Sequence, residues 1–512
     1  MAGLALNLWR LSAISSGRLS PNGHRFLLVW VGKLIWLAVF LTLALTSGCA
    51  HVQLPERDLA ARLDYDKEAA ARYRLDPNWW RAYNDQRLNE IVALAESANL
   101  DLAKIAVNLS RSLIQLGLSK ADLFPTFSGS ASASSRRELE RSSPSTRSFG
   151  GNFGLSYEVD LWRKISGAVD VAKWEYQASL EDLEAARLTL INQVINAYYN
   201  IAYLNDAIVE NERNLKNLLA VEKIVLVKHE SGQAAAVEPL QAAQSILGAK
   251  DDVLNVKQRM EEARQTLKNL LNLRPADEFE TKDLTLKGVT PPGLDLSVPL
   301  TVLANRPDLK AAEFRLFKAY KSAKNSEKAW LPSISLSSAI ASSAESFSET
   351  LNYPQGSVGL SLSLPFLDFY RVYKNVQISE LEFETARLNF ESLLSTALNE
   401  VDYYYKNYKT LREILSHSGA RLRLNQGISA YYRERYQAGA AELSDWLNAV
   451  NSANSSSLAL LQATYQLIMA ENQTFQAMGG RYVDLNSGNQ NLDSQNLGNQ
   501  NSNEQNPINP GS

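Results

Sequence analysis

Residues 149–160 of the chain read Phe-Gly-Gly-Asn-Phe-Gly-Leu-Ser-Tyr-Glu-Val-Asp, and apolar and polar residues alternate along most of this stretch. Residues 357–366 alternate in the same way, as Ser-Val-Gly-Leu-Ser-Leu-Ser-Leu-Pro-Phe. A period of two places alternate side chains of a β-strand on opposite faces. Both stretches are therefore predicted to be strands with one apolar face and one face of serine, glycine and acidic residues.

Each of these strands has a weaker partner upstream, at residues 126–134 and 333–340. The sequence thus predicts two hairpins, at about 126–160 and 333–366, with tips at 136–148 and 341–354. Strands of about ten residues with one apolar and one polar face fit the wall of a membrane barrel. A half-buried soluble sheet alternates as well, so the pattern alone leaves that alternative open. In a barrel, aromatic residues at the inner strand ends would form an interfacial girdle: Tyr157, Trp162, Phe366, Phe369 and Tyr370.

The two halves of the chain are related by a constant offset of 207 residues. The matched segments are Asp101-Leu102 with Asp308-Leu309, Phe124-Pro125-Thr126 with Leu331-Pro332-Ser333, Leu155-Ser156 with Leu362-Ser363, and Gly232 with Gly439. This period is far too long for a solenoid repeat. It indicates a duplication that gave two structurally equivalent halves.

Two hairpins supply four strands, and the smallest membrane barrels need about eight. An open sheet in lipid would leave the backbone groups at its edges without hydrogen bonds. If the sheet lies in a membrane, the chain must therefore form an oligomer that closes it.

A long helix without proline is expected after each hairpin, at residues 165–229 and 372–436. The first would be roughly 100 Å long at 1.5 Å per residue. Its heptad register from Leu180 to Val225 is mostly apolar, which is typical of coiled-coil packing. Shorter helices are expected before the hairpins, at Leu88–Asp122 and Leu309–Trp330, and after the long helices, ending near Leu273 and Met478.

The expected fold class is an α+β membrane protein, in which a long antiparallel α-helical barrel continues into a β-barrel with four strands per protomer. The segments expected along the chain are a lipoprotein signal peptide (1–48), a first repeat (49–270) with its tip turn at about 231–236, a linker (271–300), a second repeat (301–485) with its tip turn at about 438–442, and a disordered Asn/Gln-rich tail (486–512).

The amino terminus resembles a bacterial lipoprotein signal. An apolar run at residues 34–45 follows Arg25 and Lys33 and ends at Thr-Ser-Gly-Cys49, the single cysteine of the chain. The signal would make Cys49 the lipidated first residue, and Ala50 after it favours the outer membrane. The alternative is a membrane-spanning anchor at residues 26–45, in which Lys33 would cost a few kcal/mol.

Composition argues against several other functions. With 52 Lys and Arg against 55 Asp and Glu, and no basic tract, the chain is a poor fit for nucleic acid. Its four histidines lie far apart and one cysteine cannot form an internal disulfide, so no metal site or cofactor is expected. No recognisable nucleophile–base arrangement or phosphate-binding glycine loop occurs in the sequence, and no enzymatic activity is expected.

The chain resembles the TolC-type outer-membrane efflux proteins, in particular their NodT-like lipoprotein branch. The motifs that carry the resemblance run in order over about residues 75–480: Trp79-Trp80, Ser156-Tyr-Glu-Val-Asp-Leu-Trp162, Asn305-Arg-Pro-Asp-Leu309, Ala329-Trp-Leu-Pro-Ser-Ile-Ser-Leu336, Leu362-Ser-Leu-Pro-Phe366 and Arg435-Tyr-Gln-Ala-Gly439. The resemblance implies a homotrimer with a periplasmic helical tunnel. It also implies a periplasmic adaptor (membrane fusion protein) and an inner-membrane pump of the RND, ABC or MFS type as partners.

The resemblance also implies a periplasmic gate. Asp445 matches an acidic position that lines the closed aperture, while Asn448 replaces a second acidic position. Tyr436 matches a tyrosine that latches two helix pairs, and Glu238 is the candidate acid. Asp445 could instead stabilise a helix amino terminus.

The glycines at the two tip turns, Gly232 and Gly439, are candidates for adaptor docking. Helix C-caps alone would also explain them. For the whole chain, a periplasmic coiled-coil scaffold or adhesin without a pore is the alternative to an exit duct for efflux or type I secretion.

Overall fold

The computed structural model describes residues 72–484, apart from 138–144, 278–280, 282, 296–297, 299 and 353. The predicted signal peptide, Cys49, the alternative anchor at 26–45 and the tail at 486–512 lie outside the described residues. Every element described below belongs to one compact unit within Leu54–Ser512.

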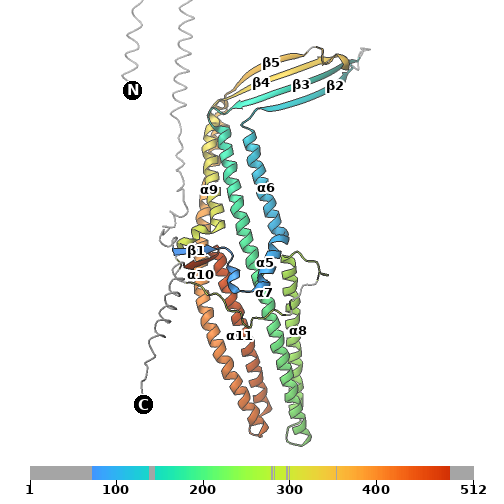
Figure 1. Ribbon diagram of the computed structural model, residues 1–512, viewed down its shortest axis with the longest axis vertical. Coiled ribbons are helices and arrows are strands. Elements are labelled where there is room, and N and C mark those ends of the chain that lie inside the picture. Colours follow the sequence, from blue (N-terminus) through green and yellow to red (C-terminus); the bar gives the residue numbers. More distant parts are fainter. Residues whose placement is uncertain are drawn as a thin grey trace, which may run out of the picture. The chain divides into compact units, whose positions relative to one another are not determined.

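The elements of the first half are β1 (Tyr73–Asp76), η2 (Trp79–Tyr83), α5 (Gln86–Ala98), α6 (Leu100–Ala121), β2 (Thr126–Arg136), β3 (Thr146–Val159), α7 (Lys164–Glu230) and α8 (Glu238–Leu270). Those of the second half are η3 (Leu300–Asn305), α9 (Pro307–Ser326), η4 (Glu327–Trp330), β4 (Ser333–Ala344), η5 (Phe347–Glu349), β5 (Gln355–Ser363), η6 (Pro365–Leu367), α10 (Phe369–Gln437), α11 (Leu443–Ala477) and β6 (Arg481–Asp484). Figure 1 shows the four strands β2–β5 at one end of this unit and the α7–α8 and α10–α11 turns at the other.

The helical stretch predicted at Leu88–Asp122 is helical, but it forms two helices rather than one. Asn99 separates α5 from α6 in an extended conformation, with φ −69° and ψ 123°. Its side-chain oxygen accepts hydrogen bonds from the backbone N–H groups of Asp101 and Leu102. Because this is the N-cap geometry that asparagine favours, α6 starts anew at Leu100.

The strands β2, β3, β4 and β5 form one antiparallel sheet in that order. Its strands extend into the predicted tips, since β3 begins at Thr146 and β4 continues to Ala344. A second, two-stranded sheet was not predicted: β1 pairs with β6, with Tyr73 opposite Asp484. It joins the start of the described chain to its end.

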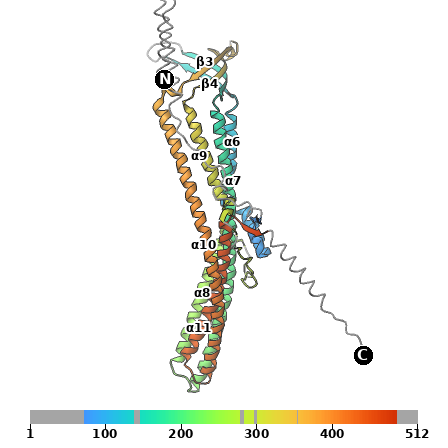
Figure 2. The same ribbon diagram turned by 90° about the vertical axis from the view of Figure 1, so that its left-hand side faces the viewer.

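The long helices form two antiparallel pairs, α7 with α8 and α10 with α11, and α7 packs on α11 to join the two halves. Figure 2 shows α10 running alongside α9 and then along the lower helices. The predicted heptad register holds from Leu190 to Val225 but not at its start, where Leu180 is exposed. There α7 buries Ala178 and Ser179 instead.

The main core lies midway along the helices, where Trp79, Trp80 and Tyr83 of η2 pack against α5 and α7. A satisfied polar network crosses it: the Trp79 indole N–H donates to Asn472 Oδ1 at 2.8 Å, and the Asn472 amide donates to Asn196 Oδ1 at 2.7 Å. Among the described helices, none combines the length and apolar character that crossing a membrane requires.

Candidate functional site

The four-stranded sheet has one apolar face, and its register defines that face without ambiguity. Leu155 lies opposite Phe127, and Ile334 lies opposite both Val159 and Leu362. Directly opposed residues of an antiparallel pair share a face. The face therefore collects the apolar residues of all four strands: Phe127, Phe149, Phe153, Leu155, Tyr157, Val159, Ile334, Leu336, Ile340, Val358, Leu360 and Leu362.

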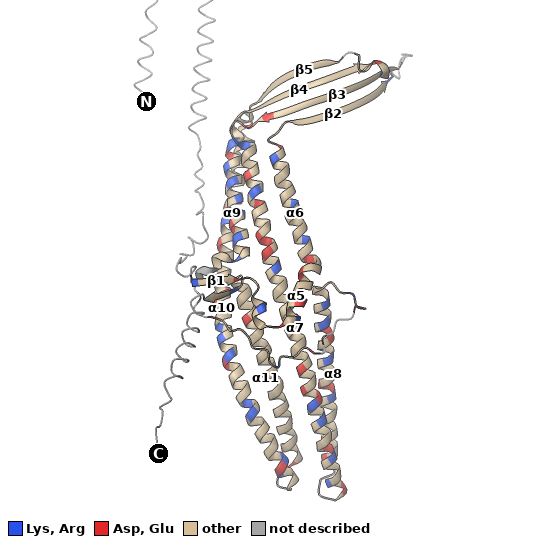
Figure 3. Ribbon diagram, viewed as in Figure 1, with Lys and Arg blue, Asp and Glu red and all other residues tan. Residues whose placement is uncertain are grey.

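This apolar face is open to the surroundings of the chain. Val358 is 84% exposed, Leu360 72% and Phe127 66%. A contiguous exposed apolar surface of this extent marks a membrane or protein interface. Charge is scarce here as well: the only charged residues of β2–β5 are Arg136, Arg147 and Glu158, and Figure 3 shows far more charge along the helices than on the strands.

The opposite face of the sheet is polar and is built mainly of serine and glycine. Two of its glycines face a serine of the neighbouring strand so closely that a Cβ atom on Gly154 would lie 3.0 Å from Ser128 Oγ, and one on Gly359 would lie 2.9 Å from Ser337 Oγ. On the apolar face, Gly151 has no atom within 4 Å of such a Cβ. The polar side chains are therefore the crowded ones, as on the concave side of a curved sheet.

The predicted girdle residues lie where the strands meet the helices. Trp162, Phe369 and Tyr370 are exposed there, whereas Tyr157 and Phe366 are half-buried. The Trp162 indole N–H donates to the Pro332 carbonyl at 2.7 Å, so it ties the exit of β3 to the entry of β4.

At the other end, the structure brings together Tyr436 and Glu238, two of the predicted gate residues. The Tyr436 hydroxyl, near the end of α10, donates a 2.6 Å hydrogen bond to Glu238 Oε2 at the start of α8. Burial and the Glu238 carboxylate raise the pKa of the Tyr436 hydroxyl above its ordinary value, so it remains a donor at neutral pH. The bond joins the first half of the chain to the second.

Two further residues hold this contact, and the sequence analysis missed both. Lys228 of α7 donates to the Tyr436 carbonyl at 2.6 Å and places its ammonium group 4.4 Å from the centre of the Tyr436 ring. The ring of Trp446 in α11 lies 5.4 Å from that of Tyr436. No motif in the sequence marks Lys228, since its role depends on how α7 and α10 meet.

Asp445 lies in the first turn of α11 and is exposed. Among the residues that the structure describes, it forms no hydrogen bond or ion pair with Tyr436, Glu238 or any other side chain. Asn448, one turn further on, is exposed as well. The structure thus separates the exposed Asp445 carboxylate from the Tyr436–Glu238 contact.

The two tip glycines both end a helix in the left-handed region, with φ +75° at Gly232 and +73° at Gly439. At each, the next residue donates to a carbonyl five positions back: Gln233 to Lys228 and Ala440 to Arg435. This is the Schellman C-cap, for which glycine is preferred. A Cβ atom would meet nothing within 4 Å at either position, so both turns are open on their outer side.

The fold and its exposed faces define a class: an outer-membrane channel protein with a long helical extension. The chain belongs to the outer membrane efflux protein family, whose sequence model matches it twice, at residues 91–273 and 298–480. Both bounds of the second match lie 207 residues beyond those of the first. It is accordingly an efflux channel component of the outer membrane.

Relatives and solved structures of the same kind match nearly full length. The chain is 40% identical over 453 residues to an uncharacterised protein of Haemophilus influenzae, covering 88% of this chain and 99% of that one. It is 36% identical over 450 residues to toxin and drug export protein A of Aggregatibacter actinomycetemcomitans, covering 88% and 98%. Its fold matches the CmeC outer membrane channel of Campylobacter jejuni with a TM-score of 0.73 at 23% identity, covering 87% of this chain and 97% of that one.

Proposed function

We propose that three copies of this chain close one β-barrel of twelve strands and one helical tunnel, and that together they form the exit duct of a tripartite efflux or type I secretion system. One observation carries the proposal: a four-stranded sheet exposes an apolar face and has β2 and β5 as its edges. Four strands cannot pair all their backbone groups in lipid. The crowding of the polar face supports a curvature with water inside and lipid outside.

The test is conduction together with stoichiometry. The purified protein, in a planar lipid bilayer, is expected to give discrete conductance steps, and native mass spectrometry is expected to give three chains per particle. A monomer that stays in solution without detergent and shows no conductance would favour the scaffold or adhesin instead.

Within this duct, we propose that Tyr436, Glu238 and Lys228 form a latch that holds the helical tip closed. The contact connects α10 to α8 and α7, and each of its hydrogen bonds involves a charged group. Such bonds contribute about 1.5–3 kcal/mol each. Opening the tip by moving α10 away from α7 and α8 would break both at once.

Three copies of the exposed Asp445 would form a ring at the aperture, whose negative field favours cations. Replacing Asp445 with asparagine is then expected to lower the ratio of cation to anion permeability. An unchanged ratio would leave Asp445 the simpler role of stabilising the amino terminus of α11.

The open turns at Gly232 and Gly439 are the proposed docking site for a periplasmic adaptor, which would connect the duct to an inner-membrane pump.

Cys49 is the proposed lipid attachment site, so Cys49→Ala should lack the added acyl mass of the mature protein. The relative named for toxin and drug export makes those two classes the first substrates to test. Deleting the gene should raise their accumulation in the cell.

A further inference from the structure

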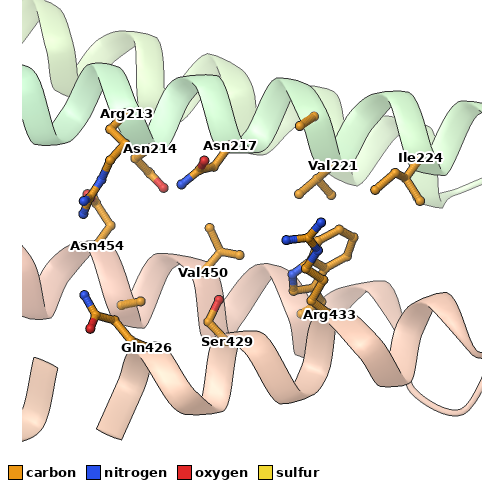
Figure 4. A pocket seen from close by; sticks show the side chains of 13 residues that line it. Arg213, Asn214, Asn217, Val221, Ile224, Gln426, Ser429, Arg433, Val450 and Asn454 are labelled. Carbon is orange, nitrogen blue, oxygen red and sulfur yellow. The ribbon is translucent and has the colours of Figure 1, made fainter. Parts of the chain in front are cut away.

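A cavity of about 400 Å³ lies between the two halves of the chain, close to the proposed latch. Figure 4 shows its two walls: α7 supplies Arg213, Asn214 and Asn217 on one side, and α10 and α11 supply the other. The volume falls within the usual range of small-molecule sites. From Arg213 to Ile224 the cavity follows α7 for about 16 Å at 1.5 Å per residue, so its occupant would be elongated.

One largely buried polar side chain in the cavity wall, Asn214, has no hydrogen-bond partner among the described residues. Asn214 is 6% exposed, and its side chain points between the two walls in Figure 4. Among the described residues, none accepts from or donates to its amide. The amide of Asn214 is thus available to a polar group of an occupant.

The charge of the cavity is positive at one end. Arg213 is already paired with Glu210, which also accepts from Ser457 Oγ at 2.9 Å. Arg433, from the opposite wall, has no carboxylate within ion-pairing distance among the described residues. A guanidinium group in this position recognises a carboxylate or a sulfonate.

The remaining walls are apolar. Val221, Val450 and Trp446 are buried and line the cavity, together with the half-buried Ile224. An occupant therefore needs an apolar body as well as its anionic head. Trp446 also lies against the Tyr436 ring, so one side chain touches both the cavity and the latch.

We propose that this cavity binds an elongated organic anion with an apolar body, with Arg433 holding its head group and Asn214 its polar edge. Because the occupant would contact α7 on one side and α10 and α11 on the other, it would stabilise the arrangement in which the latch is formed. The binding site stands on the cavity alone, while the coupling to opening rests on the proposed function.

The test uses the assembled full-length protein in lipid nanodiscs, with naphthalene-2-sulfonate as the probe and calorimetry as the readout. We expect one probe to bind per chain, and Arg433→Gln to weaken binding at least about tenfold. Arg423→Gln is the matched control, since Arg423 is an exposed residue of α10 outside the cavity. The neutral naphthalene-2-sulfonamide should bind as weakly to the original protein as the sulfonate binds to Arg433→Gln.

The coupling between ligand binding and the latch is tested by a separate measurement. By linkage, the apparent dissociation constant of a ligand that binds only the latched arrangement rises in Tyr436→Phe by the ratio of the latched fraction of the original protein to that of the variant. Equal affinity in a variant whose measured open probability has lowered the latched fraction would overturn the coupling. No saturable binding, or equal losses in Arg433→Gln and Arg423→Gln, would overturn the site and show that the cavity holds only water. Neither result depends on conduction, so a failure here is distinct from a failure of the exit-duct function.

Discussion

The Tyr83 hydroxyl donates a 3.0 Å hydrogen bond to Glu471 Oε2, where η2 meets α11 in the core. The Glu471 side chain is fully buried, and within the described part of the chain its second carboxylate oxygen has no hydrogen-bond partner. Burial raises the pKa of Glu471 to about 7, although the bond from Tyr83 lowers it in part. A segment near the start of the chain is thus held to its last long helix through a carboxyl group that titrates near neutral pH.

The first prediction concerns the stability of the original protein against pH. The pKa of Glu471 is about 7 in the folded protein and about 4.5, its ordinary value, in the unfolded chain. The folded protein therefore binds this proton more tightly. Stability should therefore be full below about pH 4.5, fall as the pH rises to 7, and level off above it, with a total loss of roughly 3 kcal/mol from this group. Glu471→Gln should remove that slope and be the more stable form at pH 8, measured as the thermal unfolding midpoint by circular dichroism.

Tyr83→Phe should change the pH dependence of stability in the opposite direction to Glu471→Gln. Removing the donor that stabilises the carboxylate should raise the pKa of Glu471 further and extend the loss of stability to higher pH. If both variants keep the pH slope of the original protein, another group is responsible for it.

The second prediction concerns the proposed latch. Tyr436→Phe removes the hydroxyl that donates to Glu238 and leaves the ring against Trp446. The loss of one charge-assisted hydrogen bond, about 1.5–3 kcal/mol, should raise the open probability roughly ten- to a hundredfold where the tip is mostly closed. Single-channel conductance is the measurement.

Tyr432→Phe is the matched control, because Tyr432 is half-buried against the same tip cluster on α10. It should leave conductance unchanged. Equal behaviour of the two variants would mean that packing, rather than the Tyr436–Glu238 bond, sets the opening of the tip.

The features that depend on local sequence pattern, namely the strands, their apolar face and the long helices, were mostly predicted from the sequence. Alternation identified the four strands and their apolar face, and the absence of proline identified α7 and α10 to within about three residues. The resemblance paired Tyr436 with Glu238, and the structure places them in hydrogen-bond contact. That they act as a gate stays a prediction, as does the role of Asp445.

What the sequence could not predict depends on long-range contacts. The pairing of β1 with β6 brings together residues more than four hundred positions apart, and neither strand is long enough to show a period. Glu471 and Lys228 look like surface residues of a helix, because only the packing of η2 and α10 against them decides their surroundings. The break at Asn99 carried a signal, an N-cap asparagine, that the helical composition around it outweighed.

The third prediction compares two glycines of the second half. Gly439 has φ +73°, where an L-residue is strained, so Gly439→Ala should destabilise the protein by about 1 kcal/mol. Gly427 lies within α10 with open space around it, so Gly427→Ala should instead stabilise by about 0.5–1 kcal/mol. Urea unfolding midpoints measure both. Opposite signs are expected, and a neutral Gly439→Ala would show that the turn can change its shape.

The fourth prediction separates the membrane wall from a soluble sheet. Leu360 is on the apolar face in the middle of β5, and Ser361 follows it on the polar face. If lipid covers the apolar face, Leu360→Arg should cost about 2–4 kcal/mol and reduce the amount of folded trimer in outer membranes. Ser361→Arg should assemble normally, because its side chain would lie in water inside the barrel, and it should shift the permeability toward anions.

If the sheet is soluble instead, Leu360→Arg should not be destabilising: an arginine at the 72% exposed Leu360 would then lie in water and improve solubility. The amount of trimer recovered from the membrane fraction for these two adjacent variants therefore decides which solvent covers the apolar face.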